Sequence, residues 1–465
     1  MFCEGCVVNN TAPVAAQAID IEFVSDIVAQ ALRAGATDAE AVFAEGDEFE
    51  TLVRLGQVEQ LKEAGSRALG LRVFQGQRTA STTTSDVSPE GISQLISGAM
   101  ALVGITSEDP CAGLPEAEDF GSISGDLDLY YDDVYSLPPA ERIEYARRAE
   151  AAAMAADVRI QNSGGGSFDA ATGRKILVNS RGFAGESRRS SCSISAQPIA
   201  MSPDGSMQRD YWFSSQRSLG LLDSPESVGV EAARRTVRKL GARKVPTQKV
   251  PLVFAPEVAS SILGAILGAI NGNAVYRSSS FLAGKLGEMV GGTNLTVIDD
   301  GTMVGGFGSS YFDGEGLPTR RKVVLDRGRL TSYLLNTYTA RKLNMKSTGN
   351  ASRGLAGAPG IGPGNFYLEP GLKTPEQIVA EVPKGLYVTD LIGHGVNIVT
   401  GDYSHGASGL WIENGEFAYP VEEVTVAGNL NDMLHNISEI GSDLIFRSSV
   451  ACPTLRVEGM TLAGE

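Results

Sequence analysis

The sequence is poor in histidine, cysteine, aromatic residues and long apolar runs. Its 465 residues include three histidines and five cysteines, and aromatic residues make up 7%. A helix that spans a bilayer needs about 20 consecutive apolar residues, and the most apolar stretch, near residues 260–270, is shorter. Residues 1–17 also lack the basic start and the apolar core of a secretory signal. We therefore expect a soluble protein with no membrane contact.

Positive charge is scarce as well, because 39 Lys and Arg residues stand against 55 Asp and Glu residues, a net charge of -16. An acidic surface repels phosphate groups, which disfavours nucleic-acid binding. The short basic run Arg320–Lys322 is interpreted as a solvated strand end. An odd, scattered set of cysteines is typical of reduced thiols and predicts a cytoplasmic location. Cys3 and Cys6 have no second C-x-x-C pair with which to form a zinc ribbon.

The residues of common hydrolytic sites are missing or isolated. A zinc hydrolase often carries two histidines and a glutamate on one helix, and no H-E-x-x-H string occurs. His394 and His405 could bind a metal together with a nearby carboxylate, although hydrogen-bonded loop histidines are the commoner alternative. That carboxylate would be Asp402 or Glu413. No G-x-S-x-G string occurs, and Cys192 lies among serines, as a buried strand thiol would.

Four glycine-rich or acidic segments resemble ligand loops only in part. Gly164–Ser167 lacks the lysine of a phosphate-binding loop, and Gly360–Gly364 has a proline where an amide donor is needed. Asp299–Gly301 and Asp313–Gly316 lack the ligand spacing of a calcium loop. We interpret both acidic segments as turns.

Glycine, by contrast, is abundant at 55 residues and separates many short runs that have strand character. Gly46-Asp47 and Gly65-Ser66 divide residues 40–74 into short candidate strands, which predicts an antiparallel meander in the N-terminal half. The helices expected around it, from apolar spacing and cap residues, span 21–34, 89–103, 138–156 and 225–240. Ser88 is the expected N-cap of the second helix, and Glu150 is expected on the exposed side of the third.

The C-terminal half begins after an expected linker at 242–248. The helix expected at 256–270 is apolar nearly all round, so we expect it to be buried. Asn414-Gly415 between two apolar runs, 409–412 and 417–421, is a strong hairpin signal. Strands and helices do not alternate steadily, so the fold class expected is α+β with two sheet-rich halves. The first half would be a meander with helices, and the second a mixed or antiparallel sheet domain.

The expected organisation has four parts, with acidic, turn-rich residues 105–137 near a boundary. They are a flexible leader (1–19), an N-terminal α+β domain (20–110), a central region that completes the N-terminal half (111–241) and a C-terminal domain (242–465).

Short segments spread over both halves match one known family in their order and spacing. In the N-terminal half they are Ala68–Phe74, Ser107–Gly113 and Gly165–Phe168. In the C-terminal half they are Val275–Leu282, Ala340–Leu343 with Ser347–Gly349, Thr400–Ser404 and Ala427–Leu430. With these segments the chain resembles the TldD/TldE (PmbA) family over about residues 20–465, and the resemblance implies a PmbA/TldD-type fold.

That family has two branches, and this chain resembles TldE/PmbA. The TldD branch carries an H-E-x-x-x-H helix that binds zinc together with a later cysteine. Here Gly264 and Ala265 stand where that branch has His-Glu, and Ala269 stands where it has the second His. Cys452 has other neighbours than the ligand cysteine, and Asp402–Ser404 is similar to the TldE/PmbA branch. The resemblance implies neither a metal site nor a catalytic residue in this chain.

The resemblance further implies a subunit of a cytoplasmic metalloprotease that degrades or processes unfolded or extended peptides. In the family a TldD-type zinc subunit and TldE form a heterodimer around a chamber. The family is linked to microcin maturation and antitoxin degradation, and carries an older label as a modulator of DNA gyrase. This chain would be the non-catalytic, chamber-forming partner, and a homodimer of the isolated chain stays open. Candidates for lining the chamber, with scaffold packing as the alternative for each, are Gly401, Asp402, Tyr403, Ser404 and Trp411.

Two other functions stay open. A stand-alone metallopeptidase would use His394 and His405, and would bind metal and cleave peptides without a partner. A non-enzymatic regulatory protein, for instance of DNA gyrase, would bind its target tightly and leave proteolysis unchanged.

Overall fold

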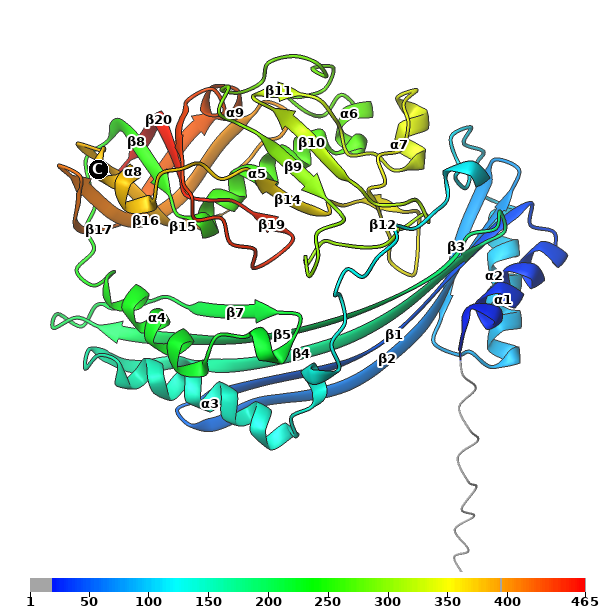
Figure 1. Ribbon diagram of the computed structural model, residues 1–465, viewed down its shortest axis with the longest axis horizontal. Helices are drawn as coiled ribbons and strands as arrows, with labels where there is room; N and C mark the ends of the chain where they lie inside the picture. Colours follow the sequence, from blue (N-terminus) through cyan, green and yellow to red (C-terminus); the bar gives the residue numbers. More distant parts are fainter. Residues whose placement is uncertain (1–18, 394, 465) are drawn as a thin grey trace, which may run out of the picture.

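A long curved sheet and a body of smaller sheets make up the two halves of the molecule (Figure 1). The computed structural model describes residues 19–393 and 395–464. The strands of the long sheet are β1 (Asp38–Arg54), β2 (Gln57–Gln75), β3 (Arg78–Thr84), β4 (Ile160–Asn179), β5 (Ala184–Met201), β6 (Met207–Arg209) and β7 (Trp212–Gln216). They follow the order β3-β2-β1-β4-β5-β6, with β7 also beside β5, and every pair is antiparallel.

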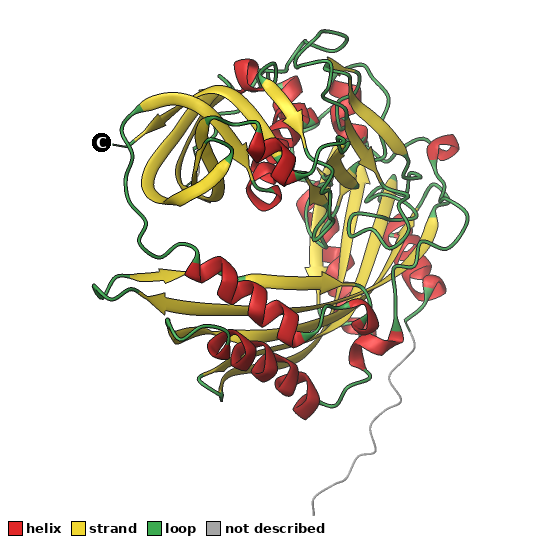
Figure 2. Cartoon of the chain, turned by 60° about the vertical axis from the view of Figure 1, so that its left-hand side comes forward, coloured by secondary structure: helices red, strands yellow, loops and turns green. Residues whose placement is uncertain are grey.

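Helices cover one face of this sheet, and strand alternation determines which face. The helices are α1 (Ile21–Arg33), α2 (Pro89–Val103), α3 (Pro139–Ala155) and α4 (Pro225–Val237), with 3-10 turns at Ala117–Asp119, Asp132–Tyr135 and Leu219–Leu221. Ala41, Phe43 and Phe49 of β1 point to the same face because they are an even number of positions apart. Ala41 and Phe43 pack in the cluster with α1 and α2, and Phe49 packs in the cluster with α3. Figures 1 and 2 show these helices on the outer, convex side, so the concave side faces the C-terminal half.

These helices begin where the sequence supplies a cap. The side chains of Asp20, Ser88 and Ser224 each accept a hydrogen bond from the backbone N–H three residues later. Such a bond satisfies one of the N–H groups that a helix leaves without an internal partner. The helices expected in this half and the cap expected at Ser88 are confirmed.

The expectation of short strands is wrong, because β1 and β2 continue without a break through Gly46 and Gly65. Gly46 pairs with Ser66 on one side and with Gly173 on the other. A Cβ atom at Gly46 would lie 2.4 Å from the carbonyl oxygen of Thr172. Glycine therefore permits a close approach of two strands here, which its sequence pattern does not distinguish from a turn.

The C-terminal half contains two larger sheets and several short helices. Its strands are β8 (Gln248–Phe254), β9 (Val297–Asp300), β10 (Arg321–Asp326), β11 (Arg329–Leu330), β12 (Ala351–Ser352), β13 (Gly360–Ile361), β14 (Asn365–Leu368), β15 (Lys384–Ile392), β16 (Asp402–Glu413), β17 (Glu416–Asn429), β18 (Ile437–Ile440), β19 (Val450–Ala451) and β20 (Leu455–Ala463). Its helices are α5 (Pro256–Ile270), α6 (Gly272–Tyr276), α7 (Thr337–Lys342), α8 (Pro375–Ala380) and α9 (Leu430–Met433). In the part of the chain that the structure describes, no helix has both the length and the apolar character that crossing a membrane demands.

One of the two sheets closes on itself. Its strands follow the order β17-β16-β15-β8-β20-β18, and β17 also pairs with β20, so that five strands form a ring. The other sheet has the order β11-β10-β9-β14-β19, and β12 pairs with β13. Both larger sheets are mixed, because β8 pairs with β15 in parallel and β14 pairs with β19 in parallel. Together with the N-terminal half, this confirms the α+β class with two sheet-rich halves.

Two expectations for the C-terminal half hold at the level of single elements. The hairpin of β16 and β17 turns at Asn414-Gly415, whose φ angles of 52° and 81° are those of a two-residue hairpin turn. Helix α5 has the expected bounds, and its side chains Ile262 and Ile266 are 1% and 0% exposed. The positions of the domain boundaries stay predictions.

Two charged residues that were expected in solvent are largely buried. Glu150 of α3 is 3% exposed and accepts hydrogen bonds from the amides of Leu55 and Gly56, at 2.8 and 2.9 Å. Lys322 of β10 lies 2.9 Å from the carboxylate of Asp299, which is fully buried in β9. Periodicity indicates the element but not the distant partner, and the partner decides whether a charge can be buried.

The first junction between the halves is a buried cluster around Glu40 of β1. The carboxylate of Glu40 lies 2.9 Å from the guanidinium of Arg72 and 2.5 Å from that of Arg353, which belongs to the C-terminal half. These three side chains are at most 7% exposed. Burial raises the pKa of Glu40, but the charges of Arg353 and Arg72 outweigh burial and lower it overall. The first junction therefore holds an ionised acid away from water.

The second junction lies at the other end of the long sheet, after α4. Lys239 lies 2.9 Å from Asp210 of the N-terminal half and 2.9 Å from Asp390 of β15. Arg235 lies 3.7 Å from Asp210. Asp390 is 30% exposed, so this junction is partly open to solvent.

The chain crosses from one half to the other through residues that are hydrogen-bonded to β17. The amide of Arg243 donates to the carbonyl of Pro420 at 3.2 Å, and the carbonyl of Arg243 accepts from the amide of Glu422 at 3.3 Å. The guanidinium of Arg243 also lies 3.4 Å from the ring centre of Tyr419. This segment, which we call the crossing segment (242–247), is therefore attached to the C-terminal ring.

Candidate functional site

Helix α5 is the element to which the resemblance assigns the metal site of the TldD branch. Gly264 is exposed, and a side chain at this position would meet nothing within 4 Å. Ala265 and Ala269 are 5% and 0% exposed and pack in the C-terminal core. The helix thus has open space at the first position and apolar packing at the other two, and none of the three supplies a ligand atom.

The polar side chains that α5 does carry are engaged by neighbouring groups. The hydroxyls of Ser260 and Ser261 each donate at 2.7 Å to a carbonyl three residues earlier in the helix. Glu257 lies 3.7 Å from Arg235 and 3.6 Å from Arg447. Zinc in proteins is bound by Cys, His, Asp or Glu, and the one such residue on α5 is held in these ion pairs. The residues of α5 do not fit a zinc ion.

Cys452 and Cys192 are buried cysteines with free thiols. Cys452 follows β19, which packs against α5, and it is 2% exposed. Burial, with the negative charge of Asp443, raises the pKa of Cys452 well above its usual value. Burial likewise raises the pKa of Cys192 on β5 to about 12. The thiolate is the form that attacks or binds metal, and burial disfavours it at both residues; the buried strand position expected for Cys192 is confirmed.

Of the two histidines, His394 lies outside the described residues. His405 on β16 is 7% exposed, its Nδ1 lies 3.1 Å from the carbonyl oxygen of Gly393, and its ring centre lies 4.7 Å from that of Tyr403. Asp402 precedes His405 by an odd number of residues, so its side chain points to the other face of the strand. Within residues 19–393 and 395–464, no group of three His, Cys, Asp or Glu could hold a metal ion.

The candidates for lining a chamber divide by their exposure. Three are buried, namely Gly401, Tyr403 and Trp411. Two are exposed, namely Asp402 and Ser404. The indole N–H of Trp411 donates to Glu413 at 3.1 Å, and the hydroxyl of Tyr403 lies 3.2 Å from that of Ser261 on α5. Of the five, only Asp402 and Ser404 are accessible to a peptide. The chamber itself stays a prediction.

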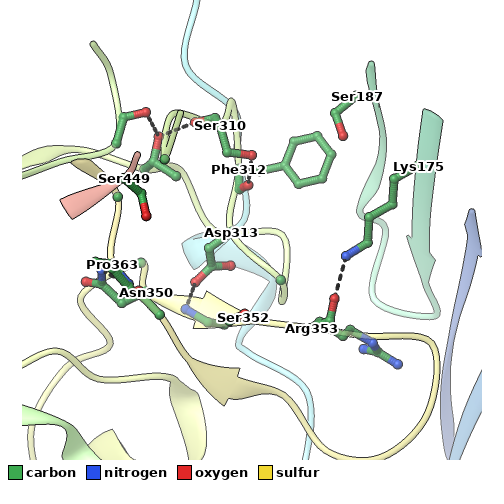
Figure 3. Close-up of a pocket in the computed structure, with 18 of the residues that line it drawn as sticks. Lys175, Ser187, Ser310, Phe312, Asp313, Asn350, Ser352, Arg353, Pro363 and Ser449 are labelled. Atoms are coloured by element: carbon green, nitrogen blue, oxygen red, sulfur yellow. Dashed lines mark hydrogen bonds between the residues drawn. The ribbon is translucent and has the colours of Figure 1, made fainter. Parts of the chain in front are cut away.

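A cavity of about 520 Å³ lies between the two halves (Figure 3). Its floor is the concave face of β4 and β5, with Gly173, Lys175, Ser187 and Arg189. Its cover comes from the C-terminal half, with lining residues in segments 307–314, 349–353 and 362–364. Ligand sites in proteins have volumes of about 300–1,000 Å³, so this hollow is large enough for part of a peptide.

Charged groups reach this cavity from both halves. Lys175 Nζ donates to the carbonyl of Arg353 at 3.0 Å, as Figure 3 shows, and Arg189 Nη2 donates to the carbonyl of Ser309 at 3.3 Å. Burial, with repulsion from Arg353 and Arg189, lowers the pKa of Lys175 to about 8. Asp313 accepts three backbone N–H groups, and burial nevertheless raises its pKa.

The sequence did not predict this cavity, although it predicted a turn at Asp313–Gly316, a segment that contributes to the cavity lining. The turn expected at Asp313–Gly316 exists, because Asp313 Oδ1 accepts from the amides of Glu315 and Leu317 at 2.9 and 3.0 Å. The same carboxylate is only 7% exposed. Its neighbours Phe312 and Leu317 are apolar and buried, but acidic residues are mostly exposed, so no local signal marked Asp313 as a buried acid.

Three domain models of one metallopeptidase family match the chain in sequence order. They are described as PmbA/TldA metallopeptidase domain 1 (residues 39–103), central domain (residues 132–240) and C-terminal domain (residues 247–464). These matches, and the fold with a long curved sheet facing a closed ring of strands, place the protein in the class of two-part metallopeptidase-family proteins.

Curated relatives cover almost the whole chain. Metalloprotease PmbA of Escherichia coli O157:H7 is 40% identical over 435 residues, which is 93% of this chain and 94% of the relative. A PmbA homologue of Haemophilus influenzae is 35% identical, over 98% of this chain and 99% of the relative. The chain belongs to the PmbA/TldD family of metallopeptidases, as its sequence motifs predicted.

Solved structures agree with this assignment. A Bacteroides thetaiotaomicron protein named as a candidate modulator of DNA gyrase has a TM-score of 0.89 at 28% identity, covering 96% of this chain and 98% of its own. TldE from Thermococcus kodakarensis has a TM-score of 0.85 at 20% identity, covering 95% of this chain and 100% of its own. At 20% identity the likeness to TldE shows the fold alone.

Proposed function

We propose that this chain is the non-catalytic subunit of a TldD/TldE-type cytoplasmic metalloprotease. It acts with a zinc-bearing TldD-type partner on unfolded or extended peptides. The observation that carries the proposal is the lack of ligand atoms at three positions of α5, because Gly264, Ala265 and Ala269 stand at the counterparts of a zinc-binding motif. The protonated thiol of Cys452 and the ion-paired Glu257 on the same part of the fold support it.

The chain would contribute by holding a peptide rather than by cleaving it. An extended peptide can pair its main chain with a free strand edge, with little preference for sequence. Strand β2 supports this role because β3 pairs only with residues Leu69–Gln75 of it, which leaves the opposite edge of residues 57–68 unpaired in the described chain. Selection of unfolded chains would follow, and microcin maturation and antitoxin degradation are the activities that the family resemblance adds.

Metal analysis and a cleavage assay test the proposal together. The purified chain is expected to hold far less than one zinc per molecule and to leave an unfolded fluorogenic peptide intact. Adding the zinc-bearing subunit is expected to give cleavage faster than that subunit alone, and a chelator is expected to stop it. Stoichiometric zinc in the isolated chain, together with cleavage by that chain, would sink the proposal.

A pair of histidine variants separates it from a stand-alone peptidase. His405→Ala is expected to leave the zinc content and the partner-dependent cleavage unchanged, because His405 is no part of the proposed chemistry. His435→Ala, at an exposed histidine, is the matched control. Loss of cleavage in His405→Ala alone would favour the alternative in which this chain binds its own metal.

A further inference from the structure

The cavity between the two halves carries more positive charge than its carboxylates neutralise. Three cations of its wall form ion pairs with acids, namely Arg174, Lys322 and Arg353. Lys175 and Arg189 instead donate to backbone carbonyls, and among the described residues neither has an ion pair. A carbonyl satisfies a donor but does not neutralise its charge, so two positive charges are left at the floor of the cavity.

These two cations are near neighbours on one face of the sheet. The register of β4 and β5 pairs Lys175 with Ser187 and Gly173 with Arg189. Lys175 and Arg189 are therefore diagonal neighbours, a relation in which positions lie about 7–8 Å apart. Repulsion by Arg189 is one of the causes that lower the pKa of Lys175. A group placed between them would accept a hydrogen bond from each and relieve this repulsion.

Asp313 lines the cavity from the C-terminal half, and its charge acts on Lys175 (Figure 3). With Asp313 ionised, one positive charge remains in surplus at the floor, which a ligand with one negative charge would balance. There is also space for a ligand, because a side chain at Gly173 would meet nothing within 4 Å.

We propose that this cavity binds a carboxylate group of a peptide, held by Lys175 Nζ and the guanidinium of Arg189. The choice of a peptide rests on the proposed function, and the charge of the ligand rests on the cavity. A carboxylate has two oxygens, one for each donor, and charge-assisted hydrogen bonds of this kind are the strong ones. The chain as a whole has a net charge of -16 and repels anions. A carboxylate would therefore bind in the cavity only at the position where it contacts both Lys175 and Arg189.

Calorimetric titration of the isolated full-length chain with N-acetylated tetra-alanine peptides tests the proposal. One peptide has a free C-terminal carboxylate, a second ends in an amide, and a third ends in an amide but contains an internal glutamate. We expect a peptide with a carboxylate to bind about tenfold more tightly than the uncharged one. Binding of the first peptide alone assigns the site to chain ends, and equal binding of the first and third assigns it to carboxylates of either origin. Equal binding of all three, or none by either charged peptide, overturns the proposal.

Variants locate the binding in the cavity. Lys175→Gln and Arg189→Gln keep a hydrogen-bond donor and remove the charge, and each is expected to weaken carboxylate binding about tenfold. Gly173→Leu fills the floor from a strand position with free space and is expected to abolish it. Lys346→Gln, at an exposed lysine outside the cavity, is the matched control and is expected to bind normally. Urea unfolding confirms that each variant is folded, and normal binding by folded Lys175→Gln and Gly173→Leu would refute the site.

The pH dependence gives a second readout. The groups that face Lys175 are Arg189 from β5, Arg353 and Asp313 from the C-terminal loops, and Glu40 from β1. A carboxylate binds the protonated lysine, so affinity is expected to fall as the pH rises above about 8, and Lys175→Gln is expected to remove this fall. None of these measurements involves zinc or a partner. Loss of the carboxylate site would leave the proposed subunit role standing, and loss of partner-dependent cleavage would leave the site standing.

Discussion

The two junctions join the same halves through ion pairs of similar residues, yet they differ in how far the charged side chains are exposed to solvent. At the first junction one carboxylate, Glu40, holds two arginines, and all three side chains are at most 7% exposed. At the second junction Lys239 lies between Asp210 and Asp390. The side chain of Asp390 is 30% exposed, so water also solvates its carboxylate.

This difference indicates which junction is the more sensitive to change. A buried charge that loses its partner cannot be rescued by water, and such a loss is strongly destabilising. A charge that is partly exposed is compensated by solvent, and exposed pairs contribute little. We therefore expect the first junction to dominate both the stability and the pH response of the contact between the halves.

The largest effect is expected from Glu40→Ala, which leaves Arg72 and Arg353 buried without their shared acid. The free energy of unfolding, measured with urea, is expected to fall by about 3–5 kcal/mol. The double variant Glu40→Ala with Arg353→Met is expected to recover part of the loss, because it removes one of the stranded charges. A loss below about 1 kcal/mol, the range of exposed pairs, would show that the two junctions do not differ in kind.

The next effect concerns pH at Glu315, a buried acid of the C-terminal half whose charge acts on Glu40 and Arg72 of the first junction. Burial, with the charge of Asp313, raises the pKa of Glu315 from 4.5 to about 7. The folded protein then keeps a proton that the unfolded chain releases, so stability is fully present below about pH 4.5 and is lost as the pH rises through about 7. Glu315→Gln is expected to remove this loss, of roughly 3 kcal/mol, in urea unfolding measured between these values.

Asp390 at the second junction provides the contrast for that measurement. Burial raises its pKa, but Lys239 outweighs burial and lowers it below the usual 3.8. Its contribution to stability is therefore present above pH 3.8 and is lost as the pH falls. Asp390→Asn is expected to change the acid range only, and an equal slope change near neutral pH in both variants would contradict the assignment.

A smaller effect is expected when the second junction itself is broken. Lys239→Met removes the cation that Asp210 and Asp390 share, while Arg235 stays 3.7 Å from Asp210. We expect a loss of about 2 kcal/mol, between the values for buried and exposed pairs. Adding Asp390→Asn is expected to restore little, since Asp390 already has solvent. A loss as large as that of Glu40→Ala would remove the distinction between the junctions.

The smallest effect is expected at an ion pair on the surface, which serves as a reference for the stability effects at the two junctions. Arg148 of α3 makes two hydrogen bonds to Glu226 of α4, at 2.8 and 3.0 Å, and the side chains are 43% and 52% exposed. A double-mutant cycle with Arg148→Ala and Glu226→Ala is expected to give a coupling below about 1 kcal/mol. High salt is expected to reduce it further, and a coupling that survives high salt would contradict this interpretation.

Local signals in the sequence predicted those parts of the fold that depend on neighbours along the chain. Helix α5, the Asn414-Gly415 turn and the cap at Ser88 follow from spacing, turn chemistry and a hydroxyl at the correct position. The long strands were missed at Gly46, where a contact with a third strand, and not a change of direction, requires glycine.

The candidate site was predictable only in the part that depends on residue identity. The lack of ligands at Gly264, Ala265 and Ala269 can be read directly from the sequence. The cavity could not be predicted, because Lys175 and Asp313 come from different halves and meet only when the halves pack. A charged residue shows its function through partners that are remote in sequence, and a single sequence does not reveal them.

The attachment of the crossing segment to β17 has a consequence for how the protein can be divided. Arg243 donates one main-chain hydrogen bond to β17 and accepts another from it, and its guanidinium lies over the ring of Tyr419. It therefore extends the C-terminal sheet by one parallel bridge, to Val421. A cut on the N-terminal side of Arg243 would end chain continuity but would break none of these bonds, nor either junction. The protein is therefore suited to being made as two co-expressed fragments that reassemble, and the concave sheet could then be varied independently of its counterpart.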